Sequence, residues 1–151
     1  MNATDLINKE LIEFDVQAET KAKALGEIAR IAYEAGRVQD QQSYFRGLME
    51  REKEFTTGFG DGIAIPHAKL DEVNEPTICI IKLSNPIDWD AMDDQPVQLV
   101  IAMAVPTQNE GKLHLKLLAT LSEQLMEDDF KEALLSACTK DEIYQVVSKI
   151  F

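Results

Sequence analysis

The stretch Val97-Gln98-Leu99-Val100-Ile101-Ala102-Met103-Ala104-Val105 is apolar throughout except at Gln98. An apolar run of this length is typical of a central β-strand that is covered on both faces. A second apolar run from Pro76 to Leu83 predicts another strand of the same sheet. Between the two runs, residues 85–90 read as a loop or the edge of a strand. The middle of the chain is therefore expected to supply the core of a sheet.

Helical patterns flank this sheet on both sides, after a short strand predicted over 11–16. Apolar residues spaced three and four apart predict each helix, and capping residues predict where it begins or ends. The predicted helices lie between Thr20 and Gly36, between Asp40 and Glu54, and over 113–125, 130–135 and 139–150. The expected fold class is α/β (α+β), with helices packed on the faces of a sheet.

Length and composition predict one soluble globular domain over residues 1–151. The net charge of −12 argues against nucleic acid and against an anionic membrane surface as partners. No apolar run approaches the roughly 20 residues that cross a bilayer, and no secretory signal opens the chain, so a cytoplasmic protein is expected. Cys79 and Cys138 are expected to be buried, reduced thiols.

The segment Gly58-Phe59-Gly60-Asp61-Gly62-Ile63-Ala64-Ile65-Pro66-His67 carries the strongest chemical signal. Its glycines predict a turn with accessible backbone N–H groups, followed by a short strand that ends at Pro66. A histidine at a strand end beside an accessible loop suits a nucleophile that a second macromolecule must reach. Local features alone leave open whether His67 is reactive or structural.

His114, the only other histidine, is expected at the start of the helix over 113–125. The positive end of the helix dipole disfavours a protonated imidazole there, although a partly exposed helix start explains this histidine equally well. A phosphate site in so acidic a chain needs local cations. The candidates are Arg51, Lys69, Lys112 and Lys116.

Other interpretations of these residues remain. Arg51 with Glu52 and Glu54 reads most simply as a solvated helix face. The three glycines do not form a nucleotide-binding fingerprint. His67 with Asp71 and Glu72 is a poor set of zinc ligands.

The segment Arg51-Glu52, the segment from Thr56 to His67, and the later stretches Pro86–Trp89, Val97–Pro106 and His114–Leu118 together resemble the fructose/mannitol-type (type-2) enzyme IIA domains. These domains belong to the bacterial phosphoenolpyruvate-dependent sugar phosphotransferase system. The resemblance covers essentially the whole chain and implies a mixed sheet with helices packed against it. It implies no cofactor and no metal.

The resemblance also implies roles for particular residues. His67 would accept a phosphoryl group from the histidine phosphocarrier protein and pass it to a cysteine of an enzyme IIB. His114 and Arg51 would stabilise the phosphoryl group, and Thr57 occupies a motif position where it would give support. A modest apolar patch around His67, with Phe59 as a contributor, is expected for docking of partners.

Three functions stay open at this point. The first is phosphotransfer in sugar transport, towards which Trp89 and the Thr-Thr-Gly-Phe-Gly loop incline the interpretation. The second is a regulatory phosphocarrier of the nitrogen-related branch, which acts by binding proteins. The third, from a different class, is a metal- or ligand-binding module with structural histidines.

Overall fold

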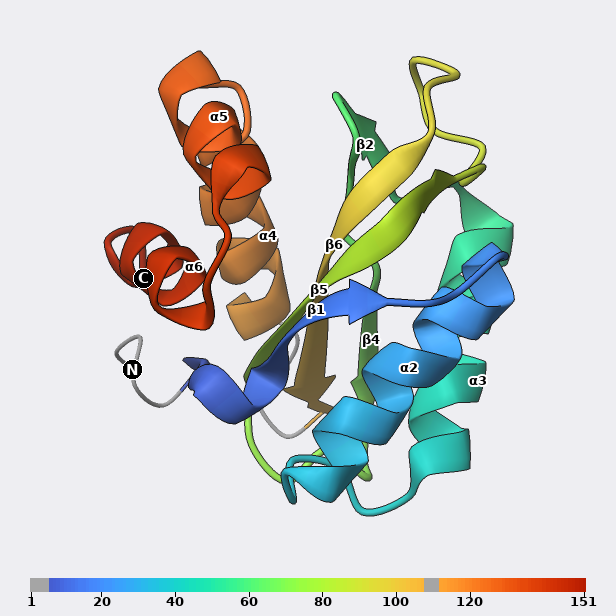
Figure 1. Ribbon diagram of the computed structural model, residues 1–151. Helices are drawn as coiled ribbons and strands as arrows, with labels where there is room; N and C mark the ends of the chain where they lie inside the picture. The colour runs from blue at the N-terminus through green and yellow to red at the C-terminus, as the bar shows by residue number, and fades with distance from the viewer. Residues whose placement is uncertain (1–5, 108–111) are drawn as a thin grey trace.

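The computed structural model describes residues 6–107 and 112–151, and side chains for 6–107 and 115–151. Figure 1 shows a twisted sheet between two groups of helices. The elements are η1 (Lys9–Leu11), β1 (Ile12–Val16), α2 (Lys21–Glu34), α3 (Gln41–Glu54), β2 (Gly58–Gly60), β3 (Ile63–Ala64), β4 (His67–Leu70), β5 (Thr77–Ile87), β6 (Val97–Pro106), α4 (Lys112–Gln124), α5 (Asp128–Ser136) and α6 (Lys140–Ser148).

The sheet is mixed and is organised around β6. Its strand order is β1-β5-β6-β3-β2, and β4 also pairs with β6. β5 runs antiparallel to β6, whereas β3 and β4 run parallel to it. The residues of β6 are buried apart from the partly exposed Gln98, which confirms the prediction of a central, doubly covered strand.

β3 and β4 lie one after the other along the same edge of β6. Ala64 pairs with Val100 and His67 with Met103, so Ile65 and Pro66 interrupt a nearly continuous line of pairing. Proline has no N–H to give to a ladder, but the Pro66 carbonyl still accepts a hydrogen bond from Met103 N at 3.0 Å. His67 is therefore the first residue of a paired strand. The expectation that a strand ends at Pro66 with His67 following it is wrong in this respect.

The helices cover both faces of the sheet. In Figure 1, α2 and α3 lie on one side and α4, α5 and α6 on the other. Thr20 caps α2 by accepting a hydrogen bond from Lys23 N at 3.2 Å, and Thr139 caps α6 by accepting one from Glu142 N at 3.1 Å. Both caps were predicted from the sequence. Asp40 also occupies the predicted cap position of α3, although its carboxylate accepts from the Ser43 hydroxyl instead of a backbone N–H.

Helix α3 packs unusually close to β4 because a glycine faces the strand. A Cβ on Gly47 would lie 3.1 Å from both Ala68 Cβ and Leu70 Cδ2. The Tyr44 hydroxyl, one turn earlier, donates to the Met103 carbonyl of β6 at 3.0 Å. These two contacts fix the helix over the strand that begins with His67.

Two further expectations need correction. β5 extends beyond the strand predicted over 76–83, because it continues past a register shift between Lys82 and Ile87. Residues 85–87 thus form the edge of this strand, which was one of the two alternatives for them. Cys79 is buried as expected, but Cys138 is exposed because it follows the end of α5. Among the described residues, no helix is long and apolar enough to cross a membrane.

The loop after β5 lies directly against β2. A Cβ on Gly58 would approach the backbone Cα of Ala91 to 2.7 Å, and the Gly58 carbonyl accepts a hydrogen bond from Met92 N at 3.2 Å. A side chain at this position would therefore force two backbone segments apart.

We predict that Gly58→Ala lowers the free energy of unfolding by about 1–3 kcal/mol, the usual cost of overpacking. Gly26→Ala is the matched control, since its Cβ would meet nothing closer than 4.0 Å. It sits inside α2, where alanine should stabilise by about 0.5–1 kcal/mol. Urea unfolding of both variants checks the pair, and equal stability of Gly58→Ala and the wild type would contradict the close contact.

Candidate functional site

The last turn of α3 brings a guanidinium group to the imidazole of His67. Arg51 Nε donates a hydrogen bond to His67 Nε2 at 3.2 Å, and Arg51 Nη1 donates to the Phe55 carbonyl at 2.7 Å. One nitrogen of the guanidinium group, Nη1, is thus held by the backbone just beyond α3. A second nitrogen, Nε, contacts the histidine ring.

The second ring nitrogen of His67 also has a backbone partner. His67 Nδ1 lies 3.2 Å from the Ile65 carbonyl oxygen, which can only accept a hydrogen bond. Nδ1 must then carry the proton, and Nε2 must carry the lone pair that accepts from Arg51. The two contacts therefore agree on one neutral tautomer. In this tautomer the nucleophilic nitrogen is Nε2.

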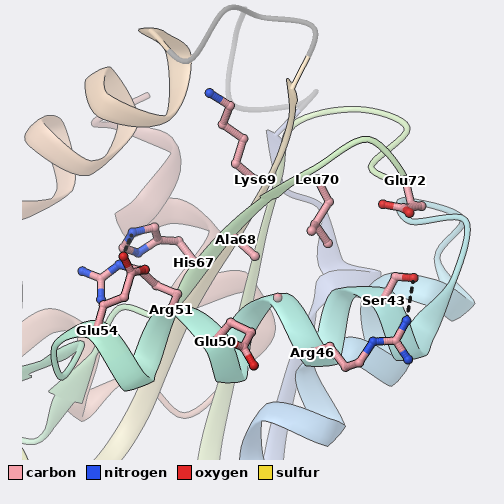
Figure 2. Close-up of a pocket in the computed structure, with 11 residues that line it drawn as sticks. Ser43, Arg46, Glu50, Arg51, Glu54, His67, Ala68, Lys69, Leu70 and Glu72 are labelled. Carbon is pink, nitrogen blue, oxygen red and sulfur yellow. Dashed lines mark hydrogen bonds between the residues drawn. The ribbon is translucent and has the colours of Figure 1, made fainter.

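A groove of about 670 Å³ runs between α3 and β4 and includes Arg51 and His67. Figure 2 shows Arg51 reaching His67 at one end and Arg46 beside Ser43 at the other, while Lys69 extends from β4 away from the helix. The groove is lined by both charges, with Glu50, Glu54 and Glu72 among its residues. Cationic side chains therefore occur along the groove, with Arg51 at His67, Lys69 on β4 and Arg46 at the far end, and they alternate with these carboxylates.

A smaller depression of about 250 Å³ also includes His67 and is mostly apolar. Phe55 and Met92 at its rim are 60% and 66% exposed, and the partly buried Phe59 contributes to its lining. Exposed large apolar side chains that gather around a depression are typical of a surface that meets partners. Phe59 thus lies in the kind of patch that the sequence predicted for docking.

Behind the site lies a buried carboxylate. The Glu52 side chain is only 4% exposed. It accepts hydrogen bonds from the Thr57 hydroxyl, from Thr57 N at 3.2 Å and from Trp89 Nε1 at 3.4 Å, and it pairs with Lys21 Nζ at 3.1 Å. The expectation that Glu52 belongs to a solvated helix face is wrong.

Comparison with known proteins shows the family to which the chain belongs. Residues 5–150 match the family described as "Phosphoenolpyruvate-dependent sugar phosphotransferase system, EIIA 2". The chain belongs to this EIIA 2 family. It is 40% identical to the fructose-specific EIIA component of Haloferax volcanii over 99% of both chains, and 36% identical to a nitrogen regulatory protein of Pseudomonas aeruginosa over 88% of this chain and 86% of that one.

The solved structures point to the same family. The crystal structure of the nitrogen regulatory protein IIA-Ntr from Neisseria meningitidis superposes with a TM-score of 0.87 at 27% identity, covering 96% of this chain and 97% of that one. The mixed sheet with helices on its faces is thus the EIIA 2 fold that the resemblance implied. Relatives named for sugar transport and for nitrogen regulation are both close.

The remaining residues predicted for an EIIA-type site fall in several places. Thr57 is buried, and its hydroxyl faces Glu52. Lys116 is exposed on α4 and is not among the residues that line either depression. His114 lies in the first turn of α4, as predicted, and Lys112 begins this helix one residue before the predicted start. The side chains of both lie outside the described residues.

The metal-binding alternative finds no support in the described part of the chain. There, no three His, Cys, Asp or Glu residues are placed to hold an ion. Asp71, one of the ligands considered, instead accepts a hydrogen bond from the Thr107 hydroxyl.

Sequence reasoning missed Glu52 and the role of Trp89, although a signal was present. Tyr44, Leu48 and Glu52 are spaced four apart and are the buried residues of α3. The helical period therefore placed Glu52 on the inner face of α3. The charge of the side chain obscured this pattern.

We predict that the neutral His67 ring is found with the proton on Nδ1. ¹⁵N NMR of the imidazole at alkaline pH should show a pyrrole-type shift for Nδ1 and a pyridine-type shift for Nε2. A predominance of the opposite tautomer would mean that the Ile65 contact does not hold in solution.

Proposed function

We propose that this EIIA 2 protein is a phosphoryl carrier in which His67 takes a phosphoryl group from a histidine phosphocarrier protein and gives it to a cysteine of an enzyme IIB. The observation that carries the proposal is the pair of contacts on His67, with Nδ1 at the Ile65 carbonyl and Nε2 at Arg51. They leave a neutral ring whose reactive lone pair lies at a depression open to a partner.

The two transfer steps need no cofactor. The Nε2 lone pair attacks phosphorus, a new P–N bond forms, and the P–N bond to the donor histidine breaks. Nδ1 keeps its proton throughout, held by the Ile65 carbonyl. In the second step a cysteine thiolate of enzyme IIB attacks phosphorus, a P–S bond forms, and the electron pair returns to Nε2.

Arg51 has two tasks in this scheme. In the resting protein its Nε–H covers the lone pair that must attack, so the guanidinium has to move aside as phosphorus approaches. The Phe55 carbonyl holds Nη1 and limits that movement. Arg51 can then donate to the phosphoryl oxygens, where a preorganised cation stabilises the charge that is being transferred.

The apolar depression suits brief docking of partners. Phe55 and Met92 are exposed next to His67, and small interfaces of this kind support transient encounters.

The part of the chain that the structure describes contains no membrane-spanning helix. We place the protein in the cytoplasm with the other components of the relay, as one EIIA unit over residues 1–151.

Transfer to a sugar-specific enzyme IIB is the preferred destination of the phosphoryl group, because the fructose-specific relative aligns over 99% of both chains. Regulation in the nitrogen-related branch is the second candidate, favoured by the IIA-Ntr structure with its TM-score of 0.87. Trp89 does not separate the two branches by contact with a partner, because it is fully buried. Transfer to a purified fructose-type enzyme IIB distinguishes them.

Phosphoenolpyruvate-dependent labelling with purified enzyme I and phosphocarrier protein tests the proposal. We expect one acid-labile phosphoryl group per chain in the wild type and none in His67→Ala. Labelling that persists in this variant would exclude His67 as the acceptor.

We further propose that His114 stabilises the phosphoryl group, as the family resemblance implies. His114→Ala should still accept phosphate but pass it to enzyme IIB more slowly, by about 10-fold or more, since it would lose one oriented donor. Quenched-flow transfer assays measure this rate. A wild-type rate would remove His114 from the mechanism.

A further inference from the structure

The buried carboxylate of Glu52 has no part in the chemistry just described, yet it lies one residue from Arg51. Burying a carboxylate is costly unless several donors compensate it, and an apolar residue often serves stability equally well. Here the donors come from three separate segments: Lys21 from the start of α2, Thr57 from the segment before β2, and Trp89 from the loop after β5. Such convergence indicates that Glu52 holds parts of the protein in register.

The segment that Glu52 holds carries one contact of the site and is hydrogen-bonded to the residue that makes the other. The backbone N–H and the hydroxyl of Thr57 both donate hydrogen bonds to the Glu52 carboxylate. Two residues earlier, the Phe55 carbonyl anchors Arg51. On the other side, the Thr57 carbonyl accepts from Ile65 N at 2.9 Å, and the Ile65 carbonyl faces His67 Nδ1.

Hydrogen bonds, linked by the backbone of Thr57 and of Ile65, therefore join Glu52 to His67. A second path reaches Arg51 through the short backbone between Thr57 and Phe55. Both the attacking imidazole and the stabilising guanidinium take their positions from a segment fixed at one point. A small displacement of that point would shift both at once, and misplacement by about 1 Å can cost a factor of about 100 in rate.

We infer that Glu52 is a positioning residue, whose buried carboxylate fixes Thr57 and thereby orients Arg51 and the Nδ1-protonated tautomer of His67 for phosphoryl transfer. This inference rests on the proposed function for its kinetic part. Its structural part concerns the state of the His67 ring and does not depend on phosphoryl transfer.

The ionised carboxylate is required because of the donors that it meets. A glutamine would keep the shape but offer one accepting oxygen, and its amide N–H₂ would face Thr57 N–H or the Lys21 ammonium group. The Lys21 charge would also lose its partner. Glu52→Gln should therefore disturb Thr57 without emptying the site of side-chain volume.

The test measures phosphoryl uptake from the phosphocarrier protein by Glu52→Gln. We expect kcat, the rate constant of uptake at saturating phosphocarrier, to fall by about 10- to 100-fold, because His67 and Arg51 are misaligned. The KM for the phosphocarrier should stay within about 2-fold, because Phe55 and Met92 still form the docking surface. The ¹⁵N shifts of His67 should move towards a mixture of the two tautomers.

Glu34→Gln is the matched control. It removes a carboxylate that pairs with Arg30 at 3.0 Å on the exposed side of α2, by the same chemical change. Its kcat and its His67 shifts should equal those of the wild type. If Glu52→Gln shows the same wild-type values while folded, the positioning role is overturned.

A second pair of variants covers the case in which Glu52→Gln does not fold. Thr57→Val removes the hydroxyl that donates to Glu52 but keeps the backbone N–H, so a smaller fall in kcat is expected, with a shift in the His67 signals. Thr57→Ser keeps the hydroxyl and should restore both. Equal behaviour of valine and serine would overturn the inference.

Failure of the proposed function has a different signature. In that case the wild type would take up no phosphoryl group from the phosphocarrier. The tautomer shift in Glu52→Gln and in Thr57→Val would still test the positioning role, and unchanged shifts would refute it.

Discussion

The close contact between α3 and β4 is the constraint from which the site follows. Gly47 lets the helix approach Ala68 and Leu70, and Tyr44 ties it to β6. Because helix and strand are held at this distance, the last turn of α3 ends beside the first residue of β4. Arg51 can then reach His67 by a direct hydrogen bond. A bulkier residue at Gly47 would separate the two elements and with them the two groups that are joined by this hydrogen bond.

The sequence predicted most of the framework because local rules govern it. The apolar run of β6, the Thr20 and Thr139 caps and the stop at Gly36, with its φ of +75°, each depend on residues near one another in the chain. The glycine-rich segment and His67 were identified for the same reason. The predictions that failed concern residues whose positions depend on partners distant in the chain. β4 exists because His67 pairs with Met103, and Glu52 is buried because donors from α2 and the loop after β5 surround it.

The net charge of the protein and the local charges at its site affect a phosphate group differently. A chain of net charge −12 repels phosphate at long range, and a phosphorylated histidine would add to that charge. Within the site the charges are few and tethered, since Arg51 is fixed by a carbonyl and Glu52 is neutralised by Lys21 on the inner side. Among the described residues, Arg51 supplies a cation in contact with His67 within an acidic background. This balance suits a carrier that must release its group again.

Trp89 is the only tryptophan of the chain, and its indole lies in the same network as Glu52 and Thr57, with the Lys21 ammonium 5.6 Å from the centre of its ring. An indole packed among a carboxylate, a hydroxyl and a cation emits light whose colour and intensity depend on those neighbours. The protein thus carries one tryptophan, and its indole N–H donates hydrogen bonds to Glu52 and Thr57. Its emission, recorded on the unmodified protein, should therefore respond to changes around Glu52, Thr57 and Lys21.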